Sequence, residues 1–157
     1  MRKKFLLASF LSVIASSWLG NPAHSFTNEI NAIESAIESK VGTKVMWSNG
    51  NNLCKGNIYG FYNPGKDVVV MCQKNHSFDY SELVGTLKHE GWHAVQRKCN
   101  NNIAALSDDL IRKHMDSQTR TVLHKYPHKQ HRSEAEARVV ENIPTKNWIK
   151  GVESYCS

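Results

Sequence analysis

The clearest hydrophobic pattern in the chain lies between residues 80 and 98, where apolar positions recur at helical spacing. Stepping about 100° per residue places one set of small and apolar residues on a single helix face. That set is Leu83, Val84, Leu87, Gly91, Ala94 and Val95. Asp79 can cap the start of this helix, with Glu82 as its reciprocal partner three residues later. Turn-forming asparagines from Asn100 to Asn102 end it.

The rest of the pattern predicts further helices and a few strands. Helical spacing and end signals occur at 28–40, 107–126, 133–142 and, as a short helix or an extended tail, 146–155. Two β-prone runs, 57–62 and 67–72, flank a Pro-Gly turn and predict an antiparallel hairpin, and 43–47 is a shorter β-prone run. The predicted fold class is α+β: a small antiparallel sheet or hairpin packed on the helix at 80–98, with further helices around it.

The polar side of the helix at 80–98 carries a chemically specific motif. His89 and His93 stand one turn apart, nearly opposite the apolar face, and Glu90 lies beside them. The apolar face of this helix already supplies its contact with the core, so the two imidazoles on the other side are not needed for core packing. They can therefore bind one metal ion. Zinc binds neutral imidazole and makes a bound water acidic, and a neighbouring carboxylate can accept the proton. The motif therefore predicts His89 and His93 as zinc ligands and Glu90 as the general base.

A catalytic zinc site normally needs a third protein ligand. A histidine six residues after His93 is excluded, because Cys99 holds that position. Glu134 is the favoured ligand, because the segment 133–138 combines glutamates with small alanines that allow helices to approach closely. The alternatives are Glu136, an aspartate, or one of the histidines His124, His128 and His131.

The stretch from His89 to Gln96, with the preceding hairpin and the later Glu134-Ala135-Glu136-Ala137, resembles the zincin metallopeptidases, most closely small gluzincin-like domains. The resemblance covers roughly residues 58–142 and implies a zincin-like fold, peptide hydrolysis and a zinc cofactor. It matches Glu134 to the family's glutamate ligand and Ala137 to a small residue three positions later. Arg138 departs from the aspartate or asparagine of the pattern, which leaves open the group that orients the histidines.

The first 25 residues predict a secretory signal peptide. Three basic residues, Arg2 to Lys4, precede an apolar run, and small residues lead to a cleavage point after about Ser25. The alternative is an uncleaved membrane anchor, but the run is short for a span and contains several serines. We therefore expect residues 26–157 to form one metallopeptidase domain that is secreted or periplasmic and has no stable membrane span.

All four cysteines follow the predicted signal, and an even number in a small exported chain indicates two disulfides. Of the three possible connectivities we favour Cys54–Cys72, which would join two strands, with Cys99–Cys156, which would tie the C-terminus to the end of the motif helix. A metal cluster is the alternative, but the chain has no Cys-x-x-Cys motif.

Charge narrows the class of partner. The chain has 20 basic and 14 acidic residues, and loss of the three basic residues in the signal leaves 17 against 14, a net charge of +3. That value, and the lack of a basic stripe interleaved with aromatic residues, argue against a nucleic-acid partner. We expect instead a peptide or protein substrate, which an edge strand of the hairpin could bind as an added strand.

The candidate donors for the oxyanion of such a reaction are Tyr126, His124, His128 and Tyr155. The main rival function is a non-catalytic, secreted metal-binding or partner-binding domain that retains the fold. Two further rivals are a hydrolase of another substrate, such as cell-wall peptide crosslinks, and a purely structural disulfide-stapled module. The sequence leaves open the cleavage specificity and the oligomeric state.

Overall fold

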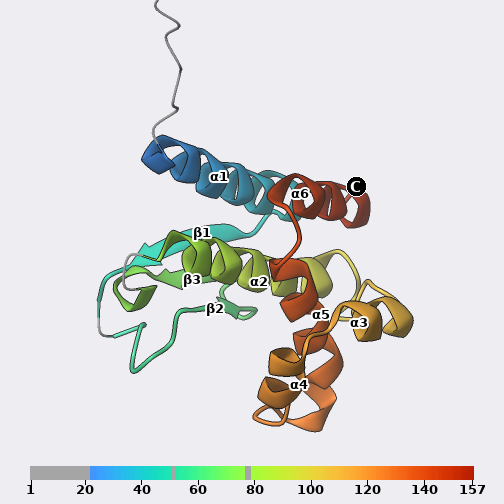
Figure 1. Ribbon diagram of the computed structural model, residues 1–157. Coiled ribbons are helices and arrows are strands. Elements are labelled where there is room, and N and C mark those ends of the chain that lie inside the picture. Colours follow the sequence, from blue (N-terminus) through green and yellow to red (C-terminus); the bar gives the residue numbers. More distant parts are fainter. Residues whose placement is uncertain (1–21, 51, 77–78) are drawn as a thin grey trace, which may run out of the picture.

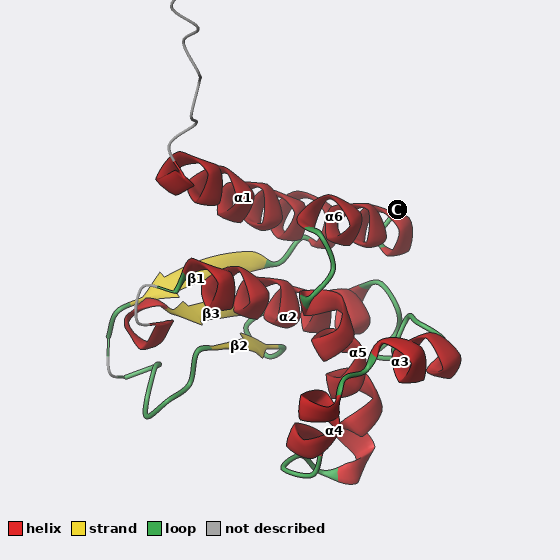
Figure 2. Ribbon diagram, viewed as in Figure 1, coloured by secondary structure: helices red, strands yellow, loops and turns green. Residues whose placement is uncertain are grey.

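The computed structural model describes residues 22–50, 52–76 and 79–157. Within these ranges, six α-helices and one small sheet form an α+β fold, as predicted (Figures 1 and 2). The helices are α1 (Pro22–Ala36), α2 (Tyr80–Lys98), α3 (Asp108–His114), α4 (Ser117–Leu123), α5 (His131–Glu141) and α6 (Thr145–Tyr155). A π-helical turn (Ile37–Val41) follows α1, and 3-10 turns occupy Gln73–His76 and His128–Gln130.

Most of the predicted signal peptide lies outside the described residues, so its cleavage stays a prediction. None of the described helices combines the length and the apolar character needed to cross a membrane.

The sheet has three strands, β1 (Lys44–Ser48), β2 (Gly60–Asn63) and β3 (Val68–Cys72). β3 lies in the middle, antiparallel to β2 and parallel to β1. The β2–β3 pair confirms the predicted hairpin, with Tyr62 opposite Val69. The parallel pairing of β1 makes the sheet mixed rather than purely antiparallel, which was not predicted. β2 is left as an edge strand.

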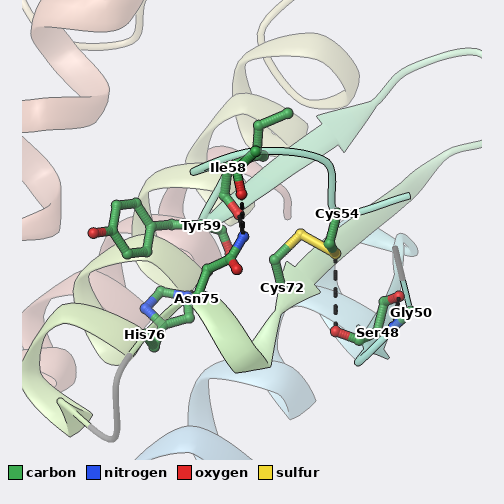
Figure 3. The surroundings of a disulfide bond; sticks show 9 residues. Ser48, Gly50, Cys54, Ile58, Tyr59, Cys72, Asn75 and His76 are labelled. Atoms are coloured by element: carbon green, nitrogen blue, oxygen red, sulfur yellow. Dashed lines mark hydrogen bonds between the residues drawn. A yellow bond between two sulfur atoms is a disulfide. The ribbon is translucent and has the colours of Figure 1, made fainter. Parts of the chain in front are cut away.

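A disulfide between Cys54 and Cys72 ties the long β1–β2 loop to the middle strand, as Figure 3 shows. Close to it, the side-chain amide of Asn75 donates a 2.6 Å hydrogen bond to the carbonyl oxygen of Ile58. Together these contacts fix the segment that leads into β2. A second disulfide joins Cys99, at the end of α2, to Cys156, just after α6. Both favoured pairings are confirmed.

Helix α2 runs through the centre of the fold and contacts the sheet, α1, α5 and α6. In Figure 1, α1 and α6 lie side by side over α2, and α3 and α4 gather around α5 beyond the far end of α2. The core between these layers is built from large, fully buried side chains. Prominent members are Ile33, Ile37, Met71, Leu87, Val95, Trp148 and Val152.

The prediction of one continuous helix over 107–126 is wrong. The chain turns to an extended conformation at Met115, and Asp116 then caps a new helix by accepting a 2.6 Å hydrogen bond from the Thr119 amide. A short aspartate side chain satisfies free amides at a helix start better than it continues a helix. The segment therefore forms two short helices, α3 and α4.

The predicted start of helix α5 at residue 133 is also wrong. The helix begins at His131, and the Ser133 hydroxyl donates a 2.9 Å hydrogen bond back to the carbonyl oxygen of Gln130. A 3-10 turn leads directly into the helix, and the His131 amide donates to the carbonyl oxygen of His128 in that turn. Within the described part of the chain, no side-chain hydrogen bond caps the start of α5.

Candidate metal centre

The helix that carries the motif forms as predicted. The Asp79 carboxylate caps α2 by accepting hydrogen bonds from the amides of Ser81, at 2.9 Å, and Glu82, at 3.2 Å. The reciprocal bond expected from Glu82 is absent, because the Asp79 amide donates to the carbonyl oxygen of His76 at 2.7 Å. All six residues of the predicted apolar face are buried. That burial fixes the rotation of α2 about its axis, and so the direction of the motif residues.

Gly91 lets the neighbouring layers approach α2 closely. A Cβ atom built on Gly91 would lie 2.6 Å from Cδ1 of Ile37 and 3.2 Å from Cζ2 of Trp148. The glycine between the two histidines therefore serves packing. Its neighbour Trp92 is 2 % exposed and packs against Trp148 and Tyr155, so Trp92 is a core residue and does not line the cleft.

Three predicted ligands meet at one point. The Nε2 atoms of His89 and His93 lie 3.2 Å apart, and each lies 3.4 Å from one carboxylate oxygen of Glu134 on α5. One ligand atom from each residue falls within 4.8 Å of the other two, so the group could hold a metal ion. Glu134 Oε2 is buried and has no hydrogen-bond partner among the described residues, a need that a cation would meet. Two imidazole nitrogens and a carboxylate are a donor set suited to zinc.

The alternative third ligands lie elsewhere. Glu136 is fully buried and accepts hydrogen bonds from the Gln96 side chain and the Leu106 amide, so it holds helices together. His131 bonds through its ring to the carbonyl oxygen of Tyr126, and the His128 ring packs on it. None of these residues belongs to the group that could hold a metal ion.

The same proximity shifts the pKa values of the metal-free group. Burial acts to lower the pKa of His89, but its contacts with Glu134 and Glu141 outweigh burial and raise that pKa to about 9. Burial acts to raise the pKa of Glu134, but its contacts with His89 and His93 lower that pKa to about 2. In the metal-free protein His89 therefore stays protonated at neutral pH, so a proton and a metal ion compete for this site.

Both histidines are held at their other ring nitrogen. His89 Nδ1 lies 2.7 Å from a carboxylate oxygen of Glu141, and His93 Nδ1 lies 2.9 Å from the side-chain oxygen of Gln96. Neither partner was predicted. A signal was present, because Glu141 lies two helical turns after Glu134 and Gln96 lies one turn after His93, so each pair shares a helix face. Such contacts fix the tautomer and ring orientation of ligating histidines.

Glu90 lies where predicted, beside the histidines, and is oriented by the edge strand. Its Oε2 atom accepts a 2.9 Å hydrogen bond from the backbone amide of Tyr62 in β2. Close packing between β2 and α2 makes this contact possible. A Cβ atom built on Gly60 would lie 2.8 Å from Cγ2 of Thr86 and 3.1 Å from the carbonyl oxygen of Val70.

Two hollows meet at the motif. One, of about 750 Å³, runs from the start of α2 to the end of α5, and the other, of about 890 Å³, runs between β2 and the segment before α5. Four residues line both hollows: Gly60, His89, Glu90 and Tyr126. We call these two adjoining hollows the cleft: His89 lines both of its halves, and His93 and Glu134 line the larger half, beside the edge strand.

The candidate oxyanion donors differ in whether they line this cleft. Tyr126 lines both halves of it, whereas the Tyr155 hydroxyl donates to the carbonyl oxygen of Ala105 and its ring packs on Trp92. His124 and His128 line neither half. Of the four candidates, Tyr126 alone lies at the site.

Comparison with protein-family models, with curated proteins and with solved structures found no match for this chain.

Proposed function

We propose that this protein is an exported, zinc-dependent peptidase with a zincin-like fold. The observation that carries the proposal is the position of Glu90. This carboxylate lies next to His89 in the helix that also presents His93, at the junction of two hollows and beside a group that could hold a metal ion. A structural metal site is closed by protein ligands, whereas three ligands facing a cleft leave a coordination position for water or substrate.

His89, His93 and Glu134 would hold the zinc. Bound there, zinc would acidify a water molecule and polarise the carbonyl group of the substrate. Glu90 would accept the proton of the attacking water and return it to the leaving nitrogen. The hydrogen bond from the Tyr62 amide keeps the Glu90 carboxylate turned toward this junction. Tyr126 is the residue best placed to donate a hydrogen bond to the developing oxyanion.

The edge strand supports a peptide as the substrate. The Cys72 amide donates to the carbonyl oxygen of Tyr59, so in the alternating antiparallel pattern Phe61 is the next residue whose backbone bonds to β3. The backbone groups of Gly60 and the carbonyl group of Tyr62 then face away from β3, whereas the Tyr62 amide on the same side already donates to Glu90. An extended peptide in the cleft could pair, as a further strand, with the edge groups that Glu90 does not occupy.

Two disulfides support an exported protein, because such bonds form and persist in oxidising compartments. The predicted signal peptide, with cleavage after Ser25, leads to the same compartment, so we infer a secreted or periplasmic location.

The decisive experiment is cleavage of a peptide library by the oxidised, zinc-loaded protein, with products identified by mass spectrometry. We expect Glu90→Gln to retain zinc and to lose turnover by about 10²–10⁴-fold, the usual contribution of a general base. Exposed Glu153, on α6, provides the matched control, and Glu153→Gln should cleave normally. Zinc binding without cleavage by the wild type would indicate the non-catalytic alternative, and normal turnover by Glu90→Gln would refute the mechanism.

A further inference from the structure

Gln96 connects the second histidine of the motif to the interior of the protein. It lies one turn after His93 on α2, is 4 % exposed, and makes three hydrogen bonds. Its side-chain nitrogen lies 3.1 Å from the carbonyl oxygen of Ser133 and 2.6 Å from Oε2 of Glu136. Its side-chain oxygen lies 2.9 Å from Nδ1 of His93.

The orientation of the Gln96 amide follows from these partners. A backbone carbonyl oxygen can only accept a hydrogen bond, so the NH₂ group of Gln96 faces Ser133 and Glu136. The side-chain oxygen is then left for His93, and it also can only accept. The His93 Nδ1 atom therefore carries a hydrogen, and in the neutral ring Nε2 keeps its lone pair and faces His89 and Glu134.

Glu136 holds Gln96 in place. Its side chain is fully buried, and its second oxygen accepts a hydrogen bond from the backbone amide of Leu106, in the loop between α2 and α3. This chain of bonds, from Leu106 through Glu136 and Gln96 to His93, joins that loop, α5 and α2. Part of the loop, Asn102 to Ala104, lines the larger hollow. The buried glutamate is thus the anchor of the chain.

We propose that Gln96, anchored by Glu136, is a positioning residue that fixes the tautomer of His93 and so directs Nε2 to the metal. The tautomer of His93 does not depend on the proposed function. The expected effect on zinc affinity does rest on the proposed function. A partner of this kind commonly changes metal affinity by about 10–100-fold when it is removed.

Long-range ¹⁵N–¹H NMR correlations of the metal-free wild type, in chelator at pH 8, test the tautomer directly. We expect His93 to be protonated at Nδ1 and unprotonated at Nε2. An Nε2–H tautomer would overturn the proposal. This measurement uses no variant, so a destabilised mutant cannot obscure it. The result for the tautomer also holds if the wild type binds no zinc. Failure to bind zinc would count against the proposed function and not against the tautomer.

Zinc affinity, measured by competition with a chromophoric chelator, tests the consequence. Gln96→Met keeps the side-chain length and removes every hydrogen bond of the Gln96 side chain. We therefore expect the dissociation constant for zinc to rise about 10–100-fold and the Nδ1–H tautomer of His93 to be lost. Gln118→Met, at an exposed position on α4, is the matched control and should bind zinc as the wild type does. Wild-type zinc affinity in a folded Gln96→Met protein would contradict the positioning role.

Discussion

The backbone amide of Tyr62 donates a 2.9 Å hydrogen bond to the carboxylate of Glu90, so the edge strand orients the proposed general base. Tyr62 is itself held through its hydroxyl, which donates to Asp67 at 3.2 Å. Burial and the neighbouring Asp67 raise the pKa of Tyr62 to about 12, so its ring stays neutral beside the cleft. The base is therefore positioned by backbone geometry, and displacing β2 should affect catalysis more than metal binding.

Gly60→Ala tests this dependence on β2. The new methyl group would overlap Thr86 and press on the carbonyl oxygen of Val70, which forces β2 away from α2. We expect kcat/KM for a peptide substrate to fall by about 10–100-fold, since small misplacements of catalytic geometry carry costs of this size. Zinc stoichiometry should not change. Gly65→Ala, in the turn after β2, is the control and should retain activity; equal losses in the two variants would remove the special role of Gly60.

Gly91 and Gly85 lie on the same helix but should respond oppositely to alanine. At Gly91 the added methyl group overlaps buried Ile37 and approaches Trp148, so we expect Gly91→Ala to lower the free energy of unfolding by about 1–3 kcal/mol. At Gly85 nothing lies within 4 Å of the built Cβ atom, so Gly85→Ala should raise it by roughly 0.5–1 kcal/mol through helix propensity. Urea unfolding of both variants measures the difference, and a stabilised Gly91→Ala protein would disprove the packing argument.

The stability of the metal-free protein should depend on His89 above neutral pH. The pKa of His89 rises from its ordinary 6.5 to about 9 on folding, because its contacts with Glu134 and Glu141 outweigh burial. A raised pKa contributes stability that is complete below pH 6.5 and lost as the pH rises through 9. Thermal unfolding in chelator should therefore show a falling melting temperature across this window.

His89→Gln should remove that slope. The control is His114→Gln, which changes an exposed histidine at the end of α3 and should preserve it. An identical slope in wild type and His89→Gln would mean that another group is responsible.

The sequence was most informative where a local pattern determines the structure. Apolar spacing, the Asp79 cap and the Pro-Gly turn predicted α2 and the β2–β3 hairpin, and the spacing of the cysteines favoured the two disulfides that form. The convergence of Glu134 with the histidines was also predicted, because a small-residue helix can approach α2 closely.

The sequence was least informative where partners are distant along the chain. The parallel pairing of β1 with β3 has no local signature, and Glu141 meets His89 across 52 positions. Gln96 looks like an ordinary polar helix residue until Glu136 and Ser133 are placed beside it. The break between α3 and α4 was missed for another reason, because the apolar spacing on either side of Asp116 resembles that of one long helix.

The most direct measurement of the central claim is zinc stoichiometry by native mass spectrometry on the oxidised protein. We expect one zinc ion per wild-type chain, loss of the ion in His93→Ala and weakened binding in Glu134→Ala. The matched controls, His114→Ala and Glu153→Ala, change exposed residues away from the cleft and should keep the ion. Absence of stoichiometric zinc in the wild type, or zinc that is retained unchanged in both site variants, would contradict the proposed metal centre.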